Sequence, residues 1–207
     1  AQSQLLLDLN TLQYLDLDAD CWNQMFLDSL TFGDKQYYAA GAISTNSYDA
    51  VRVFMFNKEL LTDLQLEDPY QLVRDGKWTF DKFNELAVNG ASDINGDTIM
   101  DLEDQWGMAW QESIGGMIFY FGMGETIAST DENGYPTISV GSERSIEVYD
   151  RISAMLQNKQ AYYIGADADI LTIFSDGRSL FFTEVLEACN RLRSSNVDFG
   201  VIPSPKY

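Results

Sequence analysis

The stretch "VRVFMFN" at residues 51–57 decides the fold class of this chain. Valine and phenylalanine favour extended backbone, and a nearly continuous apolar run of this length is typical of a strand buried inside a sheet. Two short helices are expected directly after it, at residues 58–64 and 69–74. Strands that alternate with helices in this way indicate an α/β protein.

The same alternation continues along the rest of the chain. Thr79 is expected to cap a helix that begins with "FDKFNELA", because its hydroxyl can accept a hydrogen bond from the first helical turn. The segment from Ser142 to Asn158 predicts an amphipathic helix with Ile146, Tyr149, Ile152 and Leu156 on its apolar face. Other strands are predicted in residues 30–41, 106–110, 179–183 and 197–203, and other helices in 169–177 and 185–194. Residues 115–122, "GGMIFYFG", fit a buried helix or a strand equally well.

Length and charge limit the class of protein and the class of partner. The chain has 207 residues, 45% of them hydrophobic, so it can form one large domain or two small ones with a real core. Thirteen Lys and Arg against 32 Asp and Glu give a net charge of −19, which argues against nucleic acid or an anionic membrane surface as partner. No apolar run reaches the ~20 residues that a membrane span needs. The chain opens in mid-pattern without a visible signal peptide, so we expect a targeting segment to lie outside it.

The loop "DINGDTIMDLED" at residues 93–104 has the spacing of a twelve-position calcium loop. Its oxygen donors at positions 1, 3, 5, 7, 9 and 12 are, in order, Asp93, Asn95, Asp97, the carbonyl of Ile99, Asp101 and Asp104. Thr98 stands where such loops usually have glycine, and Asp104 replaces the usual glutamate. The alternative is a solvated acidic turn, because Asp, Asn and Gly also favour ordinary turns. We expect Ca²⁺ in a structural role, since a loop that saturates its ion leaves no position open for catalysis.

Three phrases together resemble the extracellular solute-binding proteins of bacterial ABC importers, in particular their carbohydrate-binding family. They are "NKELL…LEDPYQLVRDGKWTFDKFNELA" (57–87), "DINGDTIMDLEDQWGM" (93–108), and "FSDGRSLFF" (174–182) followed by "LRSSNVDFGVIPSPKY" (192–207). The resemblance implies a periplasmic-binding-protein-like (type II) lobe with a mixed sheet flanked by helices. Residues 1–44 would be the edge portion of a first lobe. Residues 45–207 would form the second lobe, ending at the return hinge strand.

The same resemblance implies a function and a location. The protein would capture a solute, expected to be an oligosaccharide, in a cleft between two lobes and deliver it to the membrane permease of an ABC importer. It would be extracellular, anchored to the cell surface as a lipoprotein, and monomeric. The calcium loop would lie away from the cleft, where it would fasten the connection between the helix after Thr79 and the strand at 106–110.

Candidate ligand residues come from three segments, 45–49, 110–113 and 183–187, that the resemblance places near the cleft. Sugars are bound by aromatic faces against ring C–H groups and by carboxylates or amides that hydrogen-bond hydroxyls. The candidates are Tyr48, Asp49, Trp110, Gln111, Glu112, Glu184 and Glu187. For Trp110 the alternative is packing in the core, and for the three glutamates it is a solvated position, with Glu184 and Glu187 at the start of a helix.

Two other functions compete with solute binding. Glu112 and Glu184 could serve a glycoside hydrolase as paired carboxylates, but the chain has no histidine and no Gly-x-Ser-x-Gly or phosphate-binding glycine motif. A calcium-dependent interaction module of the dockerin kind would need a second copy of the acidic loop, and the sequence has one. We therefore expect no enzymatic activity.

Overall fold

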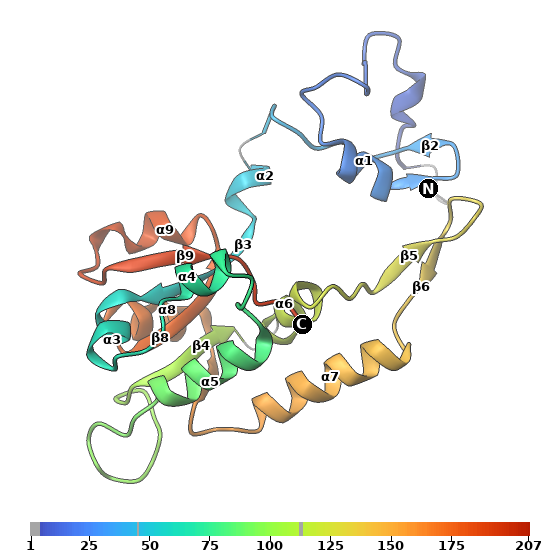
Figure 1. The fold of residues 1–207 in the computed structure, drawn as a ribbon. Coiled ribbons are helices and arrows are strands. Elements are labelled where there is room, and N and C mark those ends of the chain that lie inside the picture. The colour runs from blue at the N-terminus through green and yellow to red at the C-terminus, as the bar shows by residue number, and fades with distance from the viewer. Residues whose placement is uncertain (1–4, 45, 112–113) are drawn as a thin grey trace. The chain divides into compact units, whose positions relative to one another are not determined.

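The computed structural model describes residues 5–44, 46–111 and 114–207, which form two compact units (Figure 1). The smaller unit comprises Ala1–Val51 and Thr126–Val140, and the larger comprises Arg52–Glu125 and Gly141–Tyr207. The boundary between the two units lies between Val51 and Arg52, directly before the strand at 52–57, and the smaller unit includes residues 126–140.

The larger unit is built on a five-stranded mixed sheet. Its strands are β3 (Arg52–Asn57), β4 (Trp106–Gln111), β7 (Tyr162–Gly165), β8 (Ser179–Val185) and β9 (Phe199–Ile202), in the order β7-β4-β8-β3-β9. Strand β4 runs parallel to β7 and β8, whereas β3 runs antiparallel to β8 and β9. The run at 51–57 thus forms an interior strand, as its apolar character predicts.

Helices cover both faces of this sheet, because successive strand residues point to opposite sides. Phe54 and Phe56 belong to the larger core cluster, with α3 (Lys58–Asp63), α4 (Pro69–Arg74), α5 (Phe80–Gly90), α6 (Gly115–Gly122) and α7 (Glu143–Leu156). Met55 belongs to the opposite cluster, with α8 (Asp167–Ser175), α9 (Ala188–Arg191) and the 3₁₀ turn Leu192–Ser194. The predicted α/β fold with a mixed sheet flanked by helices is confirmed.

Side-chain caps start the helices where the sequence places them. Thr79 accepts a hydrogen bond from the Lys82 amide at 3.3 Å, and Ser142 accepts one from the Ser145 amide at 3.0 Å. The segment at 115–122, left open between helix and strand, is the helix α6.

The face that helix α7 buries differs from the predicted one. The buried residues are Ser145, Val148, Ile152 and Met155. Ile146 and Tyr149 are 53% and 65% exposed. The helix carries two apolar stripes that share Ile152, and packing against α6 buries the one that contains Val148 and Met155.

The smaller unit holds short elements and little core. Its hairpins are β1 (Thr31–Phe32) with β2 (Lys35–Gln36), which the sequence predicted, and β5 (Ala128–Thr130) with β6 (Pro136–Ile138), which it did not. Its helical elements are the 3₁₀ turn Leu9–Thr11, α1 (Gln24–Ser29) and α2 (Asn46–Asp49). The Gly33 amide donates to the Gly134 carbonyl at 3.0 Å, so the turns of the two hairpins touch. Among the described residues of this unit, only Leu27, Gln36 and Gly41 are buried.

No helix within the described part of the chain is both long enough and apolar enough to span a membrane.

Candidate ligand-binding site at the carboxyl edge of the sheet

The carboxyl ends of three parallel strands meet at one edge of the sheet. Strands β4, β7 and β8 end there at Gln111, Gly165 and Val185. The antiparallel strand β3 begins at the same edge, because Arg52 pairs with Val185. Open α/β sheets bind ligands outside the carboxyl ends of their parallel strands. This edge is therefore the candidate site.

A compensated cluster of charges lies at this edge around Glu184, which is 5% exposed. The Arg52 guanidinium (Nη1) lies 3.4 Å from Glu184 Oε1, and that of Arg191 (Nη2) lies 3.7 Å from Glu184 Oε2. The Val185 amide donates to Glu184 Oε1 at 2.8 Å. Arg191 also pairs with Glu187 at 3.3 Å and with Asp167 at 3.4 Å. Two cations and one amide therefore hold the Glu184 carboxylate inside the protein.

A hollow of 460 Å³ opens beside this cluster, against helix α6. It is lined by Arg52, Ile114, Met117, Ile118, Phe121, Gly122 and Ser204. Two close approaches shape it. A Cβ on Gly115 would lie 2.8 Å from the Trp110 ring, and one on Gly122 would lie 2.7 Å from the Ser204 side chain. Glycine at these two positions lets α6 sit directly on Trp110 and on Ser204.

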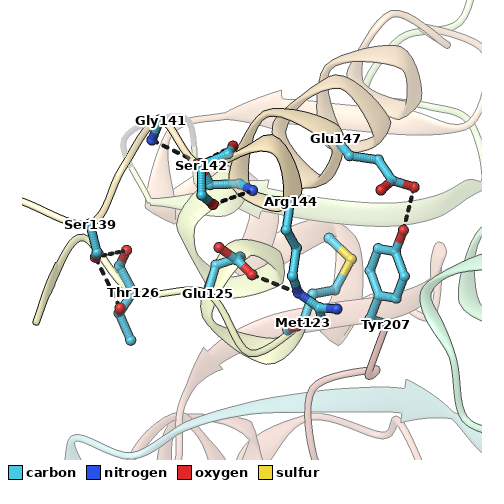
Figure 2. A network of polar contacts seen from close by, with 10 residues as sticks. Met123, Glu125, Thr126, Ser139, Gly141, Ser142, Arg144, Glu147 and Tyr207 are labelled. Atoms are coloured by element: carbon cyan, nitrogen blue, oxygen red, sulfur yellow. Dashed lines mark hydrogen bonds and ion pairs between the residues drawn. The ribbon is translucent and has the colours of Figure 1, made fainter.

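The segment 203–207 is fixed along α5 and α7, which holds Ser204 at the hollow. The Trp78 indole donates to the Pro203 carbonyl at 2.9 Å, and the Phe80 amide donates to the Lys206 carbonyl at 2.7 Å. Figure 2 shows the Tyr207 hydroxyl donating to Glu147 of α7. In the same view Arg144 of α7 reaches Glu125, at 2.7 Å. Its guanidinium also lies 4.5 Å from the centre of the Tyr207 ring.

A second hydroxyl–carboxylate contact lies at the same edge, on β7. The Tyr163 hydroxyl lies 3.4 Å from Asp169 Oδ2. Burial raises the pKa of Tyr163, and the nearby Asp169 charge adds to the rise. Tyr163 is therefore a neutral hydrogen-bond donor at physiological pH.

The structure corrects the prediction that Trp110 forms a sugar platform. Trp110 is 1% exposed, and its ring stacks on Tyr162 with centroids 5.9 Å apart and an interplanar angle of 16°. Phe119 also packs against the Trp110 ring in an edge-to-face arrangement, with the centroids 5.3 Å apart. The ring therefore has no open face for a ligand and belongs to the core, which was the alternative assignment.

The other predicted residues fall into two groups. Gln111 is half-buried at the end of β4, and Glu187 is half-buried just before α9, where Arg191 links it to Glu184. Glu184 itself lies on β8 and not at the start of a helix. Glu112 lies outside the described residues.

Tyr48 and Asp49 lie on helix α2 of the smaller unit, and both are exposed. Tyr48 lines a hollow of 350 Å³ together with residues that include Cys21, Trp22 and Gly41. This hollow is made entirely by the smaller unit.

Sequence reasoning missed the residues that line the α6 hollow. Arg52 stands inside the apolar run 51–57, and that interruption of a buried strand by a cation was the signal available. Phe121 and Met117 gave no such signal, because "GGMIFYFG" is apolar on every side.

The acidic loop at 93–104 folds around its own backbone amides. Asp93 accepts from the Gly96 amide at 2.6 Å and from the Thr98 amide at 2.8 Å. Asp104, which is fully buried, accepts from the Ile94 amide at 3.0 Å and the Asp101 amide at 2.9 Å. Thr98 has φ of 71°, so the backbone adopts at this position the turn that calcium loops usually make with glycine. Within the described residues no three or more Asp, Glu, Cys or His side chains are grouped so as to hold a metal ion.

The chain matches solved structures over nearly its whole length. It superimposes on an ABC substrate-binding protein from Listeria monocytogenes in complex with cycloalternan with a TM-score of 0.62 and 15% identity, over 99% of this chain and 49% of that one. It superimposes on the GacH receptor of Streptomyces glaucescens, solved unliganded and with acarbose, with a TM-score of 0.64 and 18% identity, over 99% of this chain and 48% of that one. It superimposes on UgpB from Mycobacterium tuberculosis, in complex with glycerophosphocholine, with a TM-score of 0.64 and 16% identity, over 99% of this chain and 47% of that one.

The chain has the fold of about half of a solute-binding protein. It spans about half the length of each of these solved structures, which is consistent with a fragment that contains mainly one lobe. No protein-family model matches the chain, and no curated protein matches it. At this level of identity the comparison defines the fold, and the ligand must be argued from the residues.

Proposed function

We propose that the full-length protein is the solute-binding component of an ABC importer and that its solute is an oligosaccharide. The observation that carries this proposal is the superposition of 99% of the chain on substrate-binding proteins and receptors of this fold. Two of those proteins were solved with the carbohydrates cycloalternan and acarbose. The solute would lie at the carboxyl edge of the sheet, where Arg52, the α6 hollow and the Glu184 cluster come together.

The chemistry of this edge supports binding rather than catalysis. A glycoside hydrolase needs one carboxyl group that can protonate the leaving oxygen and a second that faces the sugar. Glu184 is held by two guanidinium groups and an amide, so its carboxylate is turned inward. We therefore propose that the protein leaves the bonds of its solute intact, and that it is not an enzyme.

The remaining parts of the proposal follow from the same function. A component that captures a solute for import works outside the membrane, so the protein would be extracellular and anchored at the cell surface by a lipid. It would act as a monomer that presents the loaded solute to the permease. Its net charge of −19 supports a neutral solute over an anionic one.

We also propose that the loop at 93–104 binds one Ca²⁺ ion that fastens the connection between α5 and β4. The donors would be the side chains of Asp93, Asn95, Asp97, Asp101 and Asp104 with the carbonyl of Ile99, and oxygen donors of this kind are those that Ca²⁺ prefers. The positive φ of Thr98 supports this proposal, because it gives the loop its sharp turn. Binding would draw carboxylates that now accept backbone amides toward the ion, and its role would be to stabilise the fold.

A thermal-shift screen of the full-length protein against a glycan panel tests the main proposal. A ligand that binds only the native state raises the melting temperature by mass action. One class of oligosaccharide is expected to raise it, and a panel without any shift would contradict the proposal.

A further inference from the structure

The lining of the α6 hollow combines exposed apolar side chains with one cation and one hydroxyl. Its volume of 460 Å³ lies within the range of small-molecule sites, about 300–1,000 Å³. Met117 and Phe121 are 40% and 49% exposed there, so each presents an apolar surface to the opening. The ionisable side chain among its described lining residues is Arg52, and Ser204 adds a hydroxyl. The hollow therefore offers an apolar surface beside hydrogen-bond donors.

Arg52 is held so that part of its guanidinium is free for a ligand. Its ion pair with Glu184 runs from Nη1 to Oε1 at 3.4 Å, and the described residues give it no other ion-pair partner. A guanidinium carries five N–H donors in a fixed plane, and one such contact leaves most of them unused. The Arg52 side chain retains 26% of its surface exposure, whereas that of Glu184 retains 7%. Arg52 therefore faces the hollow, and Glu184 lies behind it.

The two arginines at Glu184 have different roles. Arg191 is engaged by three carboxylates, those of Asp167, Glu184 and Glu187. Within residues 5–44, 46–111 and 114–207, Arg52 pairs with Glu184 alone, so Arg52 is the cation that remains available to a solute. Its charge is balanced by Glu184, and the protein as a whole carries −19. An anionic solute would therefore gain little from Arg52 and would be repelled at long range.

We propose that Arg52 and Phe121 are the solute-contacting residues of the α6 hollow, that Glu184 positions Arg52, and that the solute is a neutral sugar. Arg52 would donate hydrogen bonds to hydroxyl or ring oxygens, and Phe121 would pack against the C–H face of a pyranose ring. This inference rests on the proposed function. It makes Glu184 a positioning residue rather than a ligand residue, and it names the side chains that would contact the solute.

The test is a calorimetric titration of the full-length protein with neutral trisaccharides, trigalacturonate and glycerophosphocholine at two salt concentrations. The neutral oligosaccharide that binds best is then titrated into variants. Arg52→Ala and Phe121→Ala are each expected to weaken binding by about tenfold or more, since a hydrogen bond from a charged group and a buried aromatic contact are each worth that much. Arg52→Lys, which keeps the charge beside Glu184, is expected to fall between wild type and Arg52→Ala.

Matched controls separate a lost contact from a damaged fold. Lys58→Ala removes a cation from the other end of β3, where it pairs with Asp198, and Tyr149→Ala removes an exposed aromatic ring from α7. Both are expected to bind like wild type. Glu184→Gln is expected to weaken binding less than Arg52→Ala does. The double variant Glu184→Gln/Arg52→Ala is expected to bind as weakly as Arg52→Ala alone, because Glu184 acts through Arg52.

The outcomes separate this inference from the function on which it rests. If a neutral sugar binds wild type, and Arg52→Ala and Phe121→Ala bind it equally well, the inference is wrong and the proposed function stands. If trigalacturonate binds best, with an affinity that falls with salt, or if glycerophosphocholine binds best at either salt concentration, the assignment of a neutral sugar is wrong. If wild type binds no sugar at all, the proposed function is wrong and the inference falls with it.

Discussion

The ring of Trp110 on β4 stacks on that of Tyr162 on β7, with their centroids 5.9 Å apart and their planes 16° from parallel. Both residues are essentially buried, with 1% and 2% of their surface exposed. The pair joins two parallel strands beneath α6. Trp110, which the sequence predicted to contact a sugar, is therefore a core residue that supports α6 beside the candidate site.

Trp110→Ala is expected to reduce the stability of the protein. Truncating a buried tryptophan leaves a cavity and typically costs about 3–5 kcal/mol of unfolding free energy. Urea denaturation measures it, and Tyr149→Ala, at an exposed position on α7, is the control that should change little. An unchanged urea midpoint for Trp110→Ala would show that the ring is not in the core.

Two adjacent glycines of α6 are expected to respond in opposite directions to alanine. A Cβ on Gly115 would meet the buried Trp110 ring at 2.8 Å, so Gly115→Ala should destabilise by about 1–3 kcal/mol through overpacking. A Cβ on Gly116 would meet only Ile152, at 3.7 Å, so Gly116→Ala should stabilise by up to about 1 kcal/mol through helix propensity. Melting temperatures of the two variants compare them directly. Equal shifts of the same sign would contradict the packing of α6 on Trp110.

Tyr162 is expected to make the protein less stable at alkaline pH. Burial raises the pKa of Tyr162 well above its ordinary value of about 10. Above pH ~10 the unfolded chain releases this proton while the folded chain keeps it, so the unfolding free energy falls by up to about 1.4 kcal/mol per pH unit. Below that pH the two states bind the proton equally, and the contribution is fully present.

Tyr162→Phe should remove this part of the alkaline loss. It also loses the hydrogen bond to Asn84, at 2.6 Å, so it should be less stable than wild type at neutral pH. Urea midpoints at pH 8 and 11 measure the change, with Tyr149→Phe as an exposed control. If the urea midpoint falls by the same amount from pH 8 to pH 11 in wild type and in Tyr162→Phe, Tyr162 does not cause the alkaline loss of stability.

Calcium is expected to raise the melting temperature, and a chelator is expected to lower it. An ion at about 100 times its dissociation constant adds about 2.7 kcal/mol of stability, which for a protein of this size is several degrees. Asp97→Asn should weaken the calcium response, because the amide oxygen carries no charge and is a poorer ligand for the ion. It should leave the chelated baseline unchanged, because the asparagine oxygen can still accept the hydrogen bond that the Ile99 amide donates to Asp97 at 2.8 Å. The same melting temperature with calcium and with excess chelator would count against a bound ion.

Thr98→Gly should stabilise the calcium-free loop. Thr98 is β-branched and has φ of 71°, a conformation that costs an L-residue about 1–2 kcal/mol. Glycine removes this strain, but it also gives the unfolded chain more conformational entropy, which costs about 0.5–1 kcal/mol of stability. The expected net gain in unfolding free energy is therefore below about 1 kcal/mol. Thr98→Ala keeps the Cβ and should gain less, and chelator-treated melts rank the three proteins. An order with alanine above glycine would contradict the strain.

Much of the fold follows from local pattern. The strand at β3 and the helix starts at Thr79 and Ser142 are set by residue type and spacing, and the structure has all three. The hairpin β5–β6 was missed because its three-residue strands are fully exposed and lack an apolar alternation. The buried face of α7 was misassigned because periodicity cannot tell which of two apolar stripes a neighbouring helix covers.

The candidate site depends on contacts that no local pattern reports. Glu184 and Arg52 are 132 positions apart and meet only because β3 pairs with β8. Whether Trp110 faces a ligand or the core depends on Tyr162 and on α6, which come later in the chain. Residue type alone predicts that the site binds by hydrogen bonds and aromatic contacts. Strand register decides which of these side chains face a ligand.

The central claim is that the protein recognises an oligosaccharide and leaves it unchanged. Titration calorimetry of the full-length protein, with the recovered sugar analysed by mass spectrometry, tests it most directly. We predict saturable binding of one oligosaccharide at one site, with the sugar recovered at its original mass. Hydrolysed sugar, or no heat of binding from any oligosaccharide, would contradict the account.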